Sequence, residues 1–91
     1  MYWEITKDLL AAELDCASRA GYSRGKVPPE TATPQRFRLL DDDGEVYYEG
    51  ILIDPLDRAS GFEPLDWAQY DSGCTEIQYW EPGKGGGWRT L

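Results

Sequence analysis

The clearest match to a catalytic motif is Gly21-Tyr22-Ser23-Arg24-Gly25, which fits the Gly-x-Ser-x-Gly pattern of a hydrolase nucleophile. That serine needs a strand before it, a helix after it and a histidine base. The chain contains no histidine, and proline-rich sequence follows the match. The commonest general base and metal ligand is therefore missing as well. Asp and Glu abound, but nothing in the sequence marks a pair as buried, so we expect no catalytic residues and a protein that is not an enzyme.

Two glycine-containing stretches resemble ion or phosphate sites. Asp41-Asp42-Asp43-Gly44 resembles a calcium loop, but with Gly44 at the sixth position of an EF-hand, Leu39 and Gly50 occupy the first and twelfth positions. The segment 83–87 (GKGGG) lacks the glycine five residues before the lysine, and the Ser or Thr after it, that a P-loop requires. We interpret the first stretch as a solvated turn and the second as a linker between strands.

Cys16 and Cys74 are the only cysteines. Two thiols without histidine are too few for a structural zinc site. In a cytosolic protein the expected state is a pair of reduced, partly buried thiols, with a disulfide as the alternative. We expect no metal and no cofactor.

Residues 36–51 are typical of a β-hairpin, because two apolar and aromatic runs flank an acidic turn that ends in Asp-Gly. A type I′ turn needs positive φ at both central residues, which Asp43-Gly44 favours. In that register Arg38 pairs with Glu49 on the outer face. A three-residue loop with Gly44 in a bulge would put Phe37 opposite Glu49, so we favour the tighter turn. The core-facing residues of the hairpin are then Phe37, Leu39, Val46 and Tyr48.

The other elements follow from periodicity and from helix and turn signals. We expect an opening strand at 3–6 with Trp3 and Ile5 inward, a helix at 8–20 with Asp8 as N-cap and Gly21 past its end, and a connection at 22–35. The alternative for 8–20 is a loop whose helical pattern comes only from its alanines. A surface loop at 54–61, a short helix at 62–73 with Pro64 at its first position, a strand at 75–80 and a closing strand at 88–91 complete the chain. The predicted fold is α+β: one small domain over 1–91, a mostly antiparallel sheet of four or five strands, and one or two short helices on one face.

The acidic residues are unevenly distributed. The chain has 17 acids and 9 bases, for a net charge of −8, and residues 39–83 hold twelve acids and a single base, Arg58. Such a field repels nucleic acid and membrane surfaces and attracts basic partners. A purely solubilising role fits the same numbers. No apolar run approaches the roughly 18–20 residues that span a bilayer and no signal-peptide pattern opens the chain, so we expect a cytoplasmic protein.

The candidate binding surface is an acidic hairpin tip beside outward-facing aromatics, since aromatic anchors with a polar rim are common in protein interfaces. Outward aromatics that pack beneath a loop or helix are the alternative. The residues of this predicted partner-binding surface are Asp41, Asp42, Asp43, Glu45, Glu49, Tyr47 and Trp80.

Several segments resemble a family of small uncharacterised plasmid-related proteins from mobile elements of proteobacteria. The resemblance lies in residues 3–8 (WEITKD), 36–50, 62–66 (FEPLD), 73–79 (GCTEIQY) and 88–91 (WRTL). It implies no activity and no catalytic residues. It does imply an accessory role in maintaining the element or in countering host defences.

Two functions are compatible with these observations. The first is an anti-CRISPR-like or DNA-mimic inhibitor, whose tip occupies the groove of a basic nucleic-acid-binding host protein. The second is an adaptor or homodimerisation module that binds through an aromatic sheet face. In both cases the partner is a protein rather than nucleic acid or membrane, and the chain itself is a monomer or a homodimer.

Overall fold

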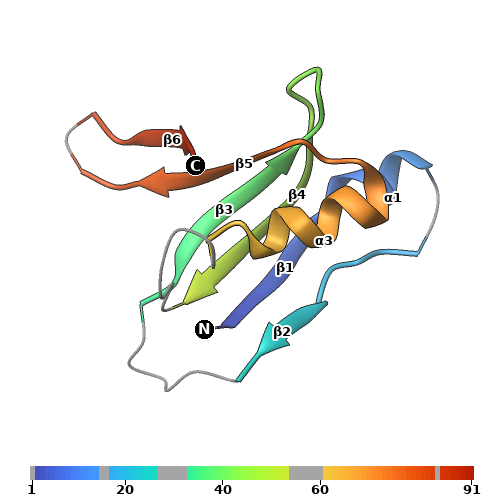
Figure 1. The fold of residues 1–91 in the computed structure, drawn as a ribbon, viewed down its shortest axis with the longest axis horizontal. Helices are drawn as coiled ribbons and strands as arrows, with labels where there is room; N and C mark the ends of the chain where they lie inside the picture. Colours follow the sequence, from blue (N-terminus) through green and yellow to red (C-terminus); the bar gives the residue numbers. More distant parts are fainter. Residues whose placement is uncertain (1, 15–16, 27–32, 54–60, 84) are drawn as a thin grey trace.

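The computed structural model describes residues 2–14, 17–26, 33–53, 61–83 and 85–91. They form a six-stranded antiparallel sheet of order β2-β1-β4-β3-β5-β6, with helices on one face (Figure 1). The strands are β1 (Tyr2–Asp8), β2 (Ser23–Gly25), β3 (Gln35–Leu40), β4 (Val46–Ile53), β5 (Glu76–Glu81) and β6 (Gly87–Thr90), and the helices are α1 (Leu9–Leu14) and α3 (Glu63–Ser72). The predicted fold class is confirmed, with six strands instead of four or five.

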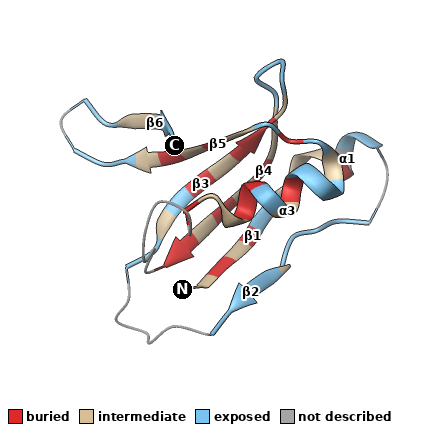
Figure 2. Ribbon diagram, in the orientation of Figure 1, coloured by how far each residue is buried: buried red, intermediate tan, exposed pale blue. Residues whose placement is uncertain are grey.

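The core lies between the sheet and α3. Alternation in the strands turns one set of side chains toward the helix, and α3 contributes Leu65 and Ala68. Buried positions accordingly gather on β1, β3, β4 and α3, while β2 and the hairpin turn are exposed (Figure 2). Every buried side chain in this layer is apolar or aromatic, and the fully buried members include Trp3, Ile5, Phe37, Leu39, Tyr48, Leu52 and Ile77.

Helix α3 ends as its sequence predicts but begins at Glu63, one residue before the predicted first position, Pro64. Pro64 lies in its first turn and Glu63 and Asp66 place acids at the positive end of the helix dipole. Gly73 ends it with φ of 78°, a conformation that glycine adopts without a steric cost. Beyond the helix, the Thr75 amide donates to the Leu40 carbonyl at 2.8 Å, which directs the chain into β5.

The N-terminal half differs from the prediction in two places. Asp8 does cap α1, since its Oδ1 accepts the Ala11 amide at 2.8 Å, but the described helix is only six residues long. Residues 17–19 are not helical, and Asp8 Oδ2 accepts the Arg19 amide at 2.7 Å. The expected connection at 22–35 contains an edge strand, β2, which pairs with β1.

The central hairpin uses a different turn from the one predicted. The Asp41 amide donates to the Glu45 carbonyl at 3.0 Å and the Gly44 amide to the Asp41 carbonyl at 3.1 Å, so the loop has three residues, 42–44. Gly44 takes the left-handed conformation, with φ of 80°. The prediction of an Asp43-Gly44 type I′ turn was therefore wrong, because a turn closed by the backbone of Asp41 requires positive φ only at Gly44.

A second irregularity restores the predicted pairing further along the strands. Leu39 pairs with Tyr48 but Leu40 pairs with Val46, so Tyr47 is an extra residue in β4. A one-residue shift exchanges the faces of the residues beyond it. Tyr47 consequently packs against the core cluster, to which Val46 does not belong.

The other predicted elements can be compared with the structure wherever their residues are described. The strands expected at 3–6, 75–80 and 88–91 and the helix expected at 62–73 are present, with ends displaced by a residue or more. The surface loop predicted at 54–61 lies outside the described residues except for Gly61, whose carbonyl accepts the buried Tyr79 hydroxyl at 2.6 Å. Among the described residues, no helix has the length and apolar character needed to cross a membrane.

Candidate functional site

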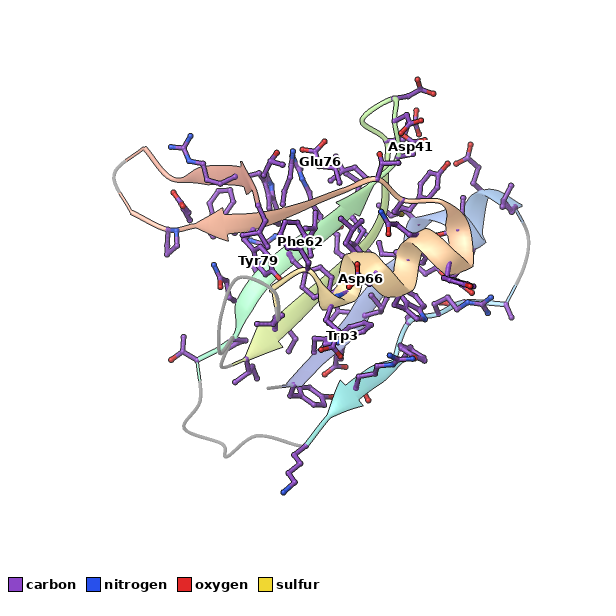
Figure 3. The ribbon with its side chains drawn as sticks, viewed as in Figure 1. Trp3, Asp41, Phe62, Asp66, Glu76 and Tyr79 are labelled. Atoms are coloured by element: carbon purple, nitrogen blue, oxygen red, sulfur yellow. The ribbon has the colours of Figure 1, made fainter. Side chains whose placement is uncertain are left out.

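The hairpin turn holds one of its acids inward. Asp41 Oδ1 accepts the backbone amides of Asp43 and Glu45, both at 2.9 Å, and Figure 3 shows Asp41 at the end of β3, at the base of the turn. The hydrogen bond from Glu45 is the main cause of a lowered pKa for this carboxyl, and bonds from the Tyr47 hydroxyl and the Asp43 amide act in the same direction. Asp41 therefore organises the loop and is not an open contact group.

The other acids of the turn face solvent. Asp42, Asp43 and Glu45 are exposed, and their carboxylates have no hydrogen bond or ion pair with any described residue. Most other described acids are engaged: Glu63 accepts from Trp3, Asp71 pairs with Arg19, Glu76 accepts from Thr90 and Gln78, and Glu81 pairs with Arg89. We call Asp42, Asp43 and Glu45 the acidic tip.

Two residues of the predicted surface lie elsewhere. Glu49 is half-buried in the middle of β4, paired in register with Arg38 and Lys7, and is not part of the acidic tip. Tyr47 was expected to point outward with Trp80, but the bulge turns it against the core. A hydrogen bond to Asp41 is the largest cause of its raised pKa. The structure thus separates the seven predicted residues into a tip, its internal support and a sheet face.

Trp80 lies on the sheet face opposite the helices, as alternation predicted. It pairs with Trp88 of β6, their rings meeting edge to face with centroids 5.5 Å apart. The Arg36 guanidinium lies 5.7 Å from the Trp80 ring and 5.4 Å from the Trp88 ring, and the Arg38 guanidinium lies 4.5 Å from the Trp88 ring. All three distances are typical of cation–π contacts, which hold a guanidinium in place without neutralising it.

A polar chain continues this arrangement toward the hairpin. Arg38 Nε donates to Gln78 Oε1 at 2.6 Å, and Gln78 Nε2 donates to Glu76 Oε2 at 2.7 Å. Thr90 also donates to Glu76, and its bond is the main cause of the lowered pKa of that carboxyl. Neither Arg36 nor Arg38 forms an ion pair with a described residue. We call Arg36, Arg38, Trp80 and Trp88 the Arg/Trp patch.

Sequence reasoning missed this patch, although part of the signal was available. Arg36 and Arg38 are two residues apart in one strand and therefore lie on the same face, and Trp80 was already predicted to point outward. A predicted pairing of β3 with β5 would have placed the two arginines beside Trp80. The register that aligns Trp88 with Trp80 depends on the 82–86 turn, whose length gives no unambiguous register.

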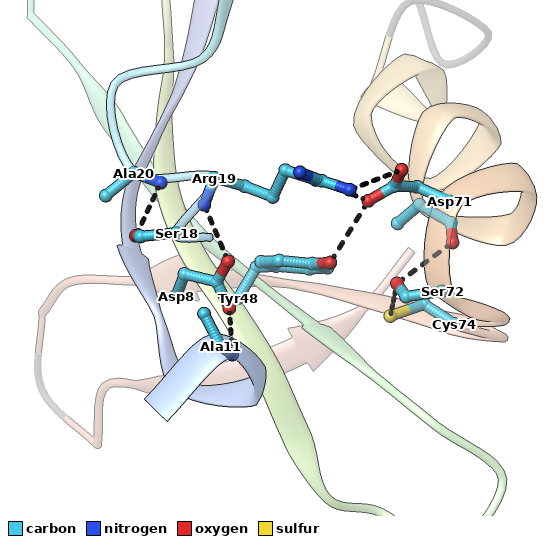
Figure 4. Close-up of polar contacts among 10 residues, drawn as sticks. Asp8, Ala11, Ser18, Arg19, Ala20, Tyr48, Asp71, Ser72 and Cys74 are labelled. Carbon is cyan, nitrogen blue, oxygen red and sulfur yellow. Dashed lines mark hydrogen bonds and ion pairs between the residues drawn. The ribbon is translucent and has the colours of Figure 1, made fainter. Parts of the chain in front are cut away.

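A second polar cluster connects elements on the helix side (Figure 4). The Arg19 side chain bonds to Asp71 at 2.9 Å, and the Tyr48 hydroxyl donates to the same carboxylate at 3.4 Å. These contacts link the segment after α1, β4 and the end of α3. Their carboxylate is engaged by fixed partners, so we interpret the cluster as structural.

The serine of the Gly-x-Ser-x-Gly match and the Cys74 thiol are not in surroundings that would support catalysis. Ser23 is the first residue of β2 and not a turn between a strand and a helix. Cys74 is a buried free thiol whose pKa burial raises to about 11, while Cys16 and Lys84 lie outside the described residues. Within the described ranges, no three His, Cys, Asp or Glu residues lie together in a way that could hold a metal ion.

No family model, curated protein or solved structure matches this chain.

Proposed function

We propose that the protein is a small acidic, non-enzymatic binding protein that inhibits a basic nucleic-acid-binding protein of its host cell through the acidic tip. The observation that carries this proposal is the contrast between the tip and most other acids. Three neighbouring carboxylates have no partner among the described residues, while Asp41 holds the loop that presents them. Neighbouring like charges repel one another, so the fold gains nothing from gathering them. A complementary cationic groove would convert that repulsion into attraction.

The mechanism is electrostatic competition. Duplex DNA attracts its proteins through closely spaced phosphate charges, and closely spaced carboxylates on a short two-stranded support offer the same sign of charge to the same groove. The role suggested by the resemblance, in a mobile element that counters host defences, fits an anti-CRISPR-like inhibitor acting in the cytoplasm.

The test compares two double variants with the same change in net charge. Asp42→Lys with Asp43→Lys reverses two of the three acids of the tip, and Glu13→Lys with Asp66→Lys reverses two exposed acids elsewhere that form no ion pair with a described residue. Asp41 is left intact because it holds the loop. Each variant, immobilised, is offered the DNA-cellulose-binding proteins of a proteobacterial lysate, at low and high salt and with duplex DNA as competitor.

We expect the parent and the control variant to capture the same basic protein, and the tip variant to lose it. Duplex DNA and high salt should both release the captured protein. Equal capture by the tip and control variants, or capture that duplex DNA does not reduce, would rule out the mimic.

A specific observation also favours the second candidate, a protein–protein module that binds through the sheet face. The Arg/Trp patch is ordered by stacking and by the bond to Gln78, yet its guanidinium groups form no ion pair with a described residue. Tryptophan and arginine are enriched in interface hot spots. The loss of an association on Trp80→Ala, with the acidic tip intact, would identify this face as the one in use.

A further inference from the structure

The sheet face that carries the Arg/Trp patch is the face without a described helix. Both described helices pack on the other side, where Ala11, Leu65 and Ala68 are buried (Figures 1 and 2). The open face is not purely polar, because the half-buried Ile51 lies on it and does not belong to the core cluster. An amphipathic sheet face of this kind is suited to contact with another protein.

The strand register shows how charge is arranged on this face. One row across the sheet contains Glu4, Ile51, Arg36, Trp80 and Trp88, because Glu4 and Arg36 both pair with Ile51 and Trp80 pairs with Trp88. The next row contains Lys7, Glu49, Arg38, Gln78 and Thr90. In both rows the acid lies on the β1–β4 side and the arginine on the β3 side, and in the second row Lys7 of β1 lies beside the acid.

This arrangement is self-complementary. A two-fold axis that runs parallel to the strands, between β3 and β4, would place β3 of one copy over β4 of the other. Since Arg38 and Glu49 lie at the same level in the register, each Arg38 would face Glu49 of the second copy. Neither of these two charged groups has an ion-pair partner within the described residues.

The dimensions of the face set the size of the interface. Six strands about 4.8 Å apart extend over roughly 24 Å, and six residues at about 3.3 Å each extend over roughly 20 Å, which gives a flat footprint of roughly 480 Å². Aligned sheets pack about 10 Å apart with a rotation of about 30°. Stable interfaces bury about 800 Å² per partner, so we expect a small interface and a weak dimer.

We propose that a second copy of this chain covers the open face, in a two-fold sheet-on-sheet dimer with reciprocal Arg38–Glu49 contacts and the Trp80–Trp88 pairs desolvated at its margins. The inference rests on the second proposed function, that the sheet face is an interface, and it names the partner as the chain itself. The acidic tips lie beyond the ends of the strands, and the same axis places the two tips next to each other at one end of the dimer, so low salt should weaken the association.

The test is complementation between two charge-reversed variants. In a homodimer of Arg38→Glu, each new glutamate would face Glu49 of the other copy, and in a homodimer of Glu49→Lys each new lysine would face Arg38. Both contacts would then be repulsive, so each variant alone should be monomeric. Mixed in equal amounts, the two restore an acid–base pair at both contacts. Sedimentation equilibrium should show the 10.3 kDa mass of a monomer for each variant alone. The equal mixture and the parent should both show twice that mass.

Two control variants carry the same changes in net charge away from the face. Glu45→Lys lies in the acidic tip, and Arg89→Glu lies on β6 with its register partner Tyr79 facing the core. Both should dimerise as the parent does. Far-ultraviolet circular dichroism and melting temperature establish that each variant is folded.

A monomeric parent into the millimolar range, or a mixture of folded Arg38→Glu and Glu49→Lys that stays monomeric, would overturn the proposal. If either variant fails to fold, the tryptophan emission of the parent decides instead. It should shift to shorter wavelength with concentration, and a concentration-independent spectrum would count against the dimer. A monomeric parent that still loses a heterologous partner on Trp80→Ala would leave the second proposed function intact and remove only the dimer.

Discussion

Asp41 and its two neighbours show how position in a turn assigns different roles to identical side chains. Asp41 accepts two backbone amides, so its charge is used inside the loop. Asp42 and Asp43, one and two residues later, have exposed carboxylates with no partner among the described residues. The difference arises because an aspartate that precedes a turn can reach the amides of the residues that follow it.

The pH dependence of stability should report this difference. The hydrogen bond from the Glu45 amide is the largest cause that holds the pKa of the Asp41 carboxyl below the ordinary value of 3.8. A carboxyl with a lowered pKa in the folded state stabilises the fold above the unfolded-state pKa, and this contribution is lost as the pH falls through the folded-state pKa. We therefore expect the advantage of the parent over Asp41→Asn in urea unfolding to be constant near neutrality and to shrink below about pH 5.

The matched control is Asp42→Asn, which removes a carboxylate without hydrogen bonds to the described residues. Its free energy of unfolding relative to the parent should show no such loss at low pH. A difference between the parent and Asp41→Asn that does not change with pH would mean that the carboxylate does not hold the turn.

At the scale of elements, the sequence was sufficient wherever a local pattern coincided with burial. Pro64 and Gly73 bounded α3, and alternation oriented Trp3, Ile5 and Ile77. The Asp-Gly pair located the hairpin but not its loop length, because Gly44 suits both a two-residue and a three-residue turn. The bulge at Tyr47 depends on pairing across strands, which no local pattern contains.

The edge strand β2 was missed for a related reason. Its three residues, Ser23–Gly25, are all exposed and have no apolar alternation. They are held by pairing with β1 and by Tyr22, whose ring stacks on Trp67 of α3 with centroids 4.9 Å apart. Tertiary contacts therefore stabilise a strand whose sequence has little intrinsic β-propensity.

The turn of the central hairpin can be tested through its glycine. At Gly44 φ is +80° and no atom lies within 4 Å of an added Cβ, so Gly44→Val meets only a conformational cost. For a residue in the left-handed region that cost is roughly 1–2 kcal/mol, and thermal unfolding should show the corresponding drop in melting temperature.

Gly87→Val is the matched control. Gly87 also has open space at its Cβ position but lies in β6 without positive φ, and valine suits a strand. We expect its melting temperature to equal or exceed that of the parent. If the two variants melted at the same temperature, the three-residue loop would be misplaced.

At the scale of the whole molecule, the structure separates two surfaces of opposite character. The acidic tip lies at the end of the β3–β4 hairpin, and the Arg/Trp patch lies on the open face of the same sheet. A chain with a net charge of −8 thus has two arginines that lie over tryptophan rings and form no ion pair within the part of the chain that the structure describes. The sequence indicated the first surface through its charge pattern, whereas the second requires strands from distant parts of the chain.

The most direct test of the central claim is an NMR titration of the protein with an oligoarginine peptide, which has the charge and the hydrogen-bonding groups of a basic groove. The account predicts that the largest amide shift changes fall on residues 42–45 and disappear at high salt. Larger changes around the other exposed acids, such as Glu13, Asp66 and Glu81, would show that the tip has no special affinity for a basic partner.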